Sequence, residues 1–113
     1  MSPRDRSYLL DILEAGDLAS GFLKGIDRTA FDQSPLLQSA VIRQLEVIGE
    51  ATKRLSEEFR AKHPDVPWRN LAGMRDILIH AYNHVDIDQV WLAAKDSLPG
   101  IVDAIRALMS HPD

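Results

Sequence analysis

Apolar side chains recur every three or four positions over most of the chain, which is the period of an α-helix rather than that of a strand. Within residues 4–23 the apolar stripe consists of Tyr8, Ile12, Ala15, Ala19 and Phe22. This spacing predicts an amphipathic first helix. Glycine, aspartate and threonine in residues 25–29 then predict a connecting segment.

A longer apolar stripe begins after Ser34-Pro35, a pair that is typical of a helix start with Ser at the N-cap and Pro at the first helical position. One face stays apolar from there to Phe59, for about seven turns. The His63-Pro64 pair ends this helix, because proline cannot continue its hydrogen-bond ladder. Gly49 lies inside the helix at a cost of about 1 kcal/mol relative to alanine. We expect another backbone to approach closely there.

Residues 65–67 predict the start of a third helix over residues 68–83. Asp86 or Asp88 then caps a last helix, which Pro99 should kink unless a new helix begins at that proline. The pattern therefore predicts an all-α fold, an antiparallel four-helix bundle, with a fifth helix if the last one breaks.

The composition supports a single domain over residues 1–113, with 45% hydrophobic and 27% charged residues. Cysteine is absent, which excludes disulfides, cysteine-ligated zinc and thiol catalysis. No window is apolar enough to cross a membrane, and no signal peptide is recognisable. We expect a cytoplasmic protein.

Charge is distributed unevenly along the chain. The formal net charge is −4, which argues against nonspecific coating of nucleic acid. Residues 53–75, however, carry six basic and three acidic side chains, and this basic stretch ends at Arg75.

The candidate chemistry lies just after that stretch, where Arg75, His80 and Tyr82 interrupt an otherwise apolar helix. Arginine is a fixed planar cation suited to phosphate, and histidine can take and give a proton near neutral pH. Together they can cleave RNA without a metal or other cofactor. Histidine would transfer protons while arginine stabilises charge on the phosphoryl oxygens.

Helical geometry qualifies this pairing. Arg75 and His80 lie about 140° apart around the helix axis, whereas Asp76 and His80 share a face and Asp76 can orient the imidazole. Arg75 also shares a face with Tyr82. Two copies that meet across a two-fold axis would form a better site than one helix, so we expect a homodimer.

Several blocks of the sequence resemble the HEPN ribonucleases. Residues 75–80 fit their Arg-x4-6-His motif, and the extension to Tyr82 gives the Arg-x4-His-x-Tyr of HepT-like toxins. Residues 48–51 (Ile-Gly-Glu-Ala) and 64–68 (Pro-Asp-Val-Pro-Trp), the latter leading to Gly73-Met74-Arg75, are similar to the same family. The likeness covers almost the whole chain.

The resemblance implies an all-helical, HEPN-like homodimer that acts as the toxin of a prokaryotic toxin–antitoxin pair. It implies a metal-independent endoribonuclease with catalytic Arg75 and His80, and with tRNA among the substrate classes. It also implies a partner, an MntA-like nucleotidyltransferase antitoxin that transfers AMP to Tyr82.

Other interpretations stay open. Arg75 could form a structural pair with Asp76 or Glu50, and Glu50 could either orient Arg75 or cap a buried network. Asp76, His80 and His84, with Asp88 nearby, could hold a metal, because their spacing places the first three on roughly one helix face. The chain could also be a non-catalytic helical binding partner of a nucleotidyltransferase.

Overall fold

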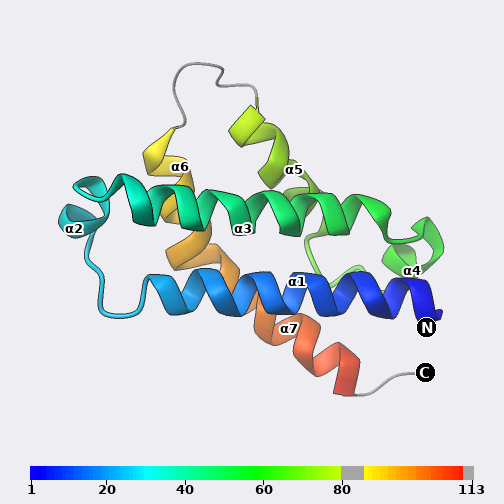
Figure 1. Ribbon diagram of the computed structural model, residues 1–113. Coiled ribbons are helices and arrows are strands. Elements are labelled where there is room, and N and C mark those ends of the chain that lie inside the picture. The colour runs from blue at the N-terminus through cyan, green and yellow to red at the C-terminus, as the bar shows by residue number, and fades with distance from the viewer. Residues whose placement is uncertain (80–85, 111–113) are drawn as a thin grey trace.

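Three packed helices form the centre of the molecule. The computed structural model describes residues 1–79 and 86–110. In this part of the chain α1 (Pro3–Phe22) and α3 (Pro35–Arg54) run antiparallel, and α3 also packs against α5 (Trp68–Ile79) on another side (Figure 1). The described residues contain helices and connecting segments and no strand. The predicted all-α fold is therefore confirmed.

Both predicted apolar stripes form the core. Ile12, Ala15 and Ala19 of α1 are buried against Val41, Leu45 and Ile48 of α3, together with further apolar side chains from the other helices. The predicted start of α3 is also correct, because the Ser34 hydroxyl accepts a hydrogen bond from the backbone N–H of Leu37 at 3.1 Å. The polar ends and apolar faces of these helices follow directly from the sequence.

The second helix predicted from the sequence is divided into two helices in the structure. α3 ends at Arg54, Leu55 is extended, and Ser56 caps a separate helix, α4 (Glu57–Lys62). The break is fixed by Asp5 at the start of α1, whose carboxylate accepts hydrogen bonds from the Ser56 N–H at 2.9 Å and the Ser56 hydroxyl at 2.8 Å. Phe59 remains buried beyond the break, which is why the apolar pattern concealed it.

A short helix also occupies part of the predicted connection between the first two long helices. α2 (Arg28–Asp32) begins where the Asp27 carboxylate accepts a hydrogen bond from the Ala30 N–H at 2.8 Å. Its Phe31 is fully buried, and the ring packs against Trp91 with centroids 5.2 Å apart. Asp27, which indicated a connecting segment in the sequence, is thus the N-cap of the short helix α2.

The last helical region has three parts. α6 (Ile87–Trp91) is capped by Asp86, one of the two predicted caps, and passes through a π-helical turn (Leu92–Ser97) into α7 (Leu98–Ser110). Pro99 lies at the start of α7 and lacks the N–H that would bond the carbonyl of Lys95. The π-helical turn therefore comes just before the proline at which the sequence predicted a kink or a new helix. None of the described helices is long and apolar enough to cross a lipid bilayer.

Candidate active site

Arg75 lies on α5, on the side of the helix that faces α3. Leu71 and Met74 of α5 are buried in the core, which fixes the rotation of the helix. Gly49 of α3 lies directly opposite: a Cβ atom there would lie 2.8 Å from the Cβ of Arg75 and 2.9 Å from its backbone nitrogen. The expected close approach of a second backbone at Gly49 is confirmed, and the approaching residue is Arg75 itself.

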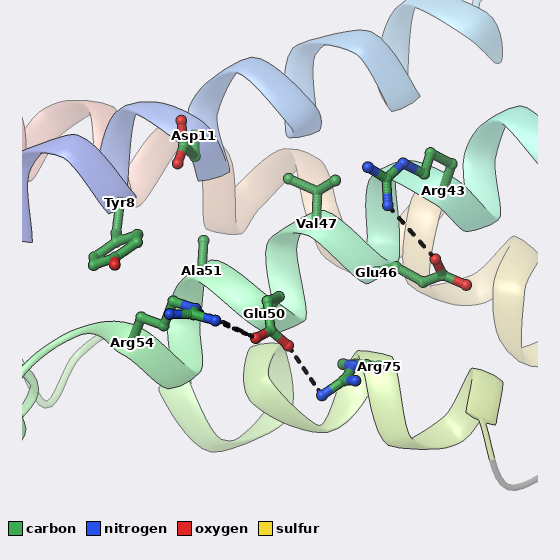
Figure 2. A pocket seen from close by; sticks show the side chains of 9 residues that line it. All are labelled: Tyr8, Asp11, Arg43, Glu46, Val47, Glu50, Ala51, Arg54 and Arg75. Atoms are coloured by element: carbon green, nitrogen blue, oxygen red, sulfur yellow. Dashed lines mark hydrogen bonds and ion pairs between the residues drawn. The ribbon is translucent and has the colours of Figure 1, made fainter.

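Glu50 joins two arginines from different helices. Its Oε2 lies 2.9 Å from Nη1 of Arg75, and its Oε1 lies 3.2 Å from Nη2 of Arg54 (Figure 2). Oε2 is buried and accepts no well-directed hydrogen bond from the described residues, so its contact with Arg75 is an ion pair. The carboxylate therefore holds the two guanidinium groups on either side of itself.

Tyr8 of α1 completes this cluster. Hydrogen bonds that Arg54 donates to the side chains of Tyr8 and Glu50 raise the pKa of this exposed guanidinium, which stays positive at any physiological pH. Sequence reasoning did not single out Tyr8 or Arg54 for chemistry. The i, i+4 spacing of Glu50 and Arg54 was a signal for one contact, but nothing in the sequence joins Tyr8 to α3.

An open groove of about 410 Å³ runs along these side chains between α1 and α3 and reaches Arg75 on α5 (Figure 2). It is lined by Tyr8, Asp11, Arg43, Glu46, Val47, Glu50, Ala51, Arg54 and Arg75. Its volume is within the range of roughly 300–1,000 Å³ that is usual for ligand sites. Arg75 thus lies at the edge of a space that can hold part of a ligand.

Asp76 accepts a hydrogen bond from Lys53 Nζ at 2.9 Å, and Lys53 belongs to the basic stretch of the sequence. His80 and Tyr82 lie outside the described residues, so the contact of Asp76 with His80 stays a prediction. Of the two structural pairings that the sequence allowed for Arg75, the one with Glu50 is present.

Only part of the alternative metal site lies among the described residues. His80 and His84 lie outside the described residues, and Asp88 of α6 forms an ion pair with Arg28 of α2. Among residues 1–79 and 86–110 no group of three acidic or histidine side chains could hold a metal ion.

Comparison with known proteins identifies the family. The profile described as "Ribonuclease HepT-like" matches residues 12–108. A protein of Methanocaldococcus jannaschii named "Putative RNase MJ1380" is 42% identical over 102 residues, which covers 89% of this chain and 94% of that protein. "Probable ribonuclease HepT" of Thermococcus cleftensis is 43% identical over 101 residues, covering 89% of this chain and 92% of the relative.

No solved structure matches the chain. The family profile and the relatives, however, extend over the helices that hold Arg75, Glu50 and Arg54 and over the whole Arg75–Tyr82 segment. The chain therefore belongs to the HepT-like ribonuclease family and is an endoribonuclease.

Proposed function

We propose that this endoribonuclease is the toxin of a toxin–antitoxin pair and cleaves RNA, with tRNA as a candidate substrate, without a metal ion. His80 is the proton-transfer group and Arg75 the group that stabilises the reacting phosphate. The protein acts as a homodimer, because the angular offset of these two residues on one helix favours a site shared between two copies.

The reaction is an internal transfer at phosphorus. The ribose 2′-oxygen attacks the adjacent phosphorus while His80 accepts the 2′-hydroxyl proton, and the bond from phosphorus to the 5′-oxygen breaks. The leaving 5′-oxygen takes up a proton from the second histidine of the dimer. The products are a 2′,3′-cyclic phosphate and a 5′-hydroxyl, and Arg75 stabilises the negative charge that builds on the phosphoryl oxygens.

The observation that carries this proposal is the placement of Arg75. Its side chain is 41% exposed at the groove, and Glu50 contacts it through Nη1. A guanidinium has five N–H donors, so a contact through one nitrogen leaves other donors for a phosphate. An arginine that is oriented by a carboxylate and still partly open to solvent is suited to hold a transferring phosphoryl group.

The test is RNA cleavage by purified protein in the presence of EDTA. The wild-type chain should cleave, whereas His80→Ala and Arg75→Ala should each lose about 10²- to 10⁴-fold in rate with the helical fold retained. Arg69→Ala, which removes an exposed arginine at the start of α5 outside the groove, is the matched control and should cleave normally. Normal cleavage by His80→Ala, or loss of wild-type cleavage on chelation, contradicts the mechanism.

The proposed antitoxin is a nucleotidyltransferase that transfers AMP from ATP to the Tyr82 hydroxyl, with release of pyrophosphate. The added phosphate would compete for Arg75 and repel the RNA backbone. Co-expression should add the mass of AMP to the wild-type chain and not to Tyr82→Phe. An equal mass gain on wild type and Tyr82→Phe would show that another residue is modified. Binding of the antitoxin without any mass gain would show that it inhibits by binding rather than by modification.

A further inference from the structure

The groove extends well beyond the proposed reacting phosphate. Arg75 of α5 lies at one end of the groove, and Tyr8 and Asp11 of α1 line the wall opposite α5. Beyond Asp11 and Arg43, which line both spaces, a second hollow of about 300 Å³ continues along the same two helices. The two adjoining spaces could hold successive parts of a chain-like ligand that is bound at Arg75.

Charged side chains in the groove differ in whether they already form ion pairs with other residues. Glu50 pairs with Arg54 and Arg75, and Glu46 lies 3.9 Å from Arg43. Asp11 is the groove carboxylate that forms no ion pair with any described residue. It is exposed, so its oxygens are available to a hydrogen-bond donor on a ligand.

Tyr8 offers an aromatic surface in the same space. The ring is half-buried against the core, and the guanidinium carbon of Arg4 lies 5.8 Å from the ring centroid. Tyr8 lines the groove, and Arg4 covers one face of its ring. A nucleobase could take that place while Arg4, which is exposed, moves to a neighbouring phosphate.

We propose that this groove is a nucleotide-binding subsite, which receives the nucleotide next to the scissile phosphate. Arg54 and Arg75 bind phosphate oxygens, Tyr8 stacks on the base, and Asp11 accepts a hydrogen bond from an exocyclic amino group. The carboxylate therefore favours cytosine over uracil, which presents a carbonyl at the corresponding position. This subsite rests on the proposed function and adds a base preference to it.

Binding of an RNA that cannot be cleaved tests the subsite separately from the reaction. The probes are short, fluorescent 2′-O-methyl oligocytidine and oligouridine, which have no 2′-hydroxyl to attack. Wild type should bind oligocytidine more tightly than oligouridine in an anisotropy titration. Tyr8→Leu, which keeps an apolar side chain against the core, should weaken binding of both probes by roughly 5- to 150-fold, the range for loss of one stacked base. Tyr8→Phe keeps the ring and should bind much more tightly than Tyr8→Leu.

The carboxylate has its own matched pair of variants. Asp11→Asn should reduce the preference for oligocytidine over oligouridine, whereas Asp103→Asn, the same exchange at an exposed position of α7, should leave it unchanged. Equal binding by wild type, Tyr8→Leu and Asp11→Asn overturns the subsite even if the protein cleaves RNA. A shift of Tyr8→Leu from dimer to monomer in sedimentation also overturns it, because the groove would then be an interface between copies. If the probes bind as expected and no RNA is cleaved, the proposed function fails and the subsite stands.

Discussion

Glu50 is the residue on which the arrangement of the site depends. Its carboxylate lies between Arg75 on α5 and Arg54 on its own helix, so one side chain sets the position of two cations. The sequence left open whether Glu50 orients Arg75 or caps a buried network. The observed ion pair and the exposure of both partners, 41% for each side chain, support the orienting role at the edge of the groove.

Glu50→Gln keeps the shape of this side chain and removes its charge. We expect RNA cleavage to fall about 10- to 100-fold, mainly in kcat, because a displaced arginine no longer matches the reacting phosphate. Glu58→Gln, which alters an exposed carboxylate of α4 that pairs with Lys62 outside the groove, is the control and should change the rate little. Unchanged or faster cleavage by Glu50→Gln would show that Glu50 restrains Arg75 rather than positions it.

Asp5 is the residue whose titration should affect stability. Burial raises its pKa, but the hydrogen bonds from Ser56 and Ser2 outweigh burial and leave the pKa below its ordinary value. A lowered pKa in the folded state means that the charged form stabilises the fold above about pH 4, and that this contribution is lost as the pH falls through the folded-state pKa.

Asp5→Asn should therefore lower the free energy of unfolding at neutral pH by about 1–3 kcal/mol, the usual range for hydrogen bonds to a charged group. Urea denaturation at pH 7 and at pH 3 measures the effect. The difference between wild type and Asp5→Asn should shrink at the lower pH, because below the ordinary carboxyl pKa the unfolded wild-type chain binds a proton that the folded chain resists. A difference of the same size at both pH values would contradict this assignment.

At the scale of the elements, the packing of α3 against α5 is what delivers Arg75 to the groove. The two helices approach closely because residue 49 has no side chain. Any added atom would meet the backbone of Arg75, which cannot move aside without moving α5.

Gly49→Ala should destabilise the fold by about 1–3 kcal/mol through overpacking, although alanine is the better helix former. Gly73→Ala in α5 is the control, because an added Cβ there meets nothing within 4 Å. It should be neutral or stabilising by up to about 1 kcal/mol. Thermal unfolding of both variants measures the contrast, and equal effects would mean that the approach at Gly49 is not tight.

The sequence predicted the helices and their caps better than the contacts between helices. Period and caps were enough for α1, for the start of α3 and for the Asp86 cap, since these depend on neighbours along the chain. The break at Ser56 was not apparent, because its strongest bonds come from Asp5, a residue 51 positions away. The contact of Tyr8 with Arg54 is of the same kind, since side chains on different helices meet only once the fold exists.

At the scale of the whole molecule, the groove formed by α1 and α3 meets α5 at Arg75, the proposed reacting cation, which is exposed there. The net charge of −4 means that RNA binding must come from local side chains rather than from the overall field. The helical spacing of the sequence predicts that Arg75 and His80 point about 140° apart, which is the reason for expecting that two copies share each site.

Mixing Arg75→Ala with His80→Ala chains tests this sharing. Each mixed dimer carries one intact arginine and one intact histidine. Partial activity would show that a shared site has two redundant halves, whereas no activity would show that the site needs both histidines, as the proposed reaction does. Activity is measured after the chains have exchanged, with the separate variants as controls. A wild-type protein that sediments as a monomer at micromolar concentration and cleaves at its full rate would contradict a shared site.

The chemistry of the cleaved ends tests the central claim most directly. Wild-type protein in EDTA should produce a 2′,3′-cyclic phosphate and a 5′-hydroxyl, and replacing the single 2′-hydroxyl at the cleavage position by hydrogen should block the cut. Mass spectrometry of the products from the two substrates, with His80→Ala alongside, reads out both points. A 5′-phosphate end, or cleavage of the 2′-deoxy substrate at the same position, would contradict attack by the 2′-hydroxyl.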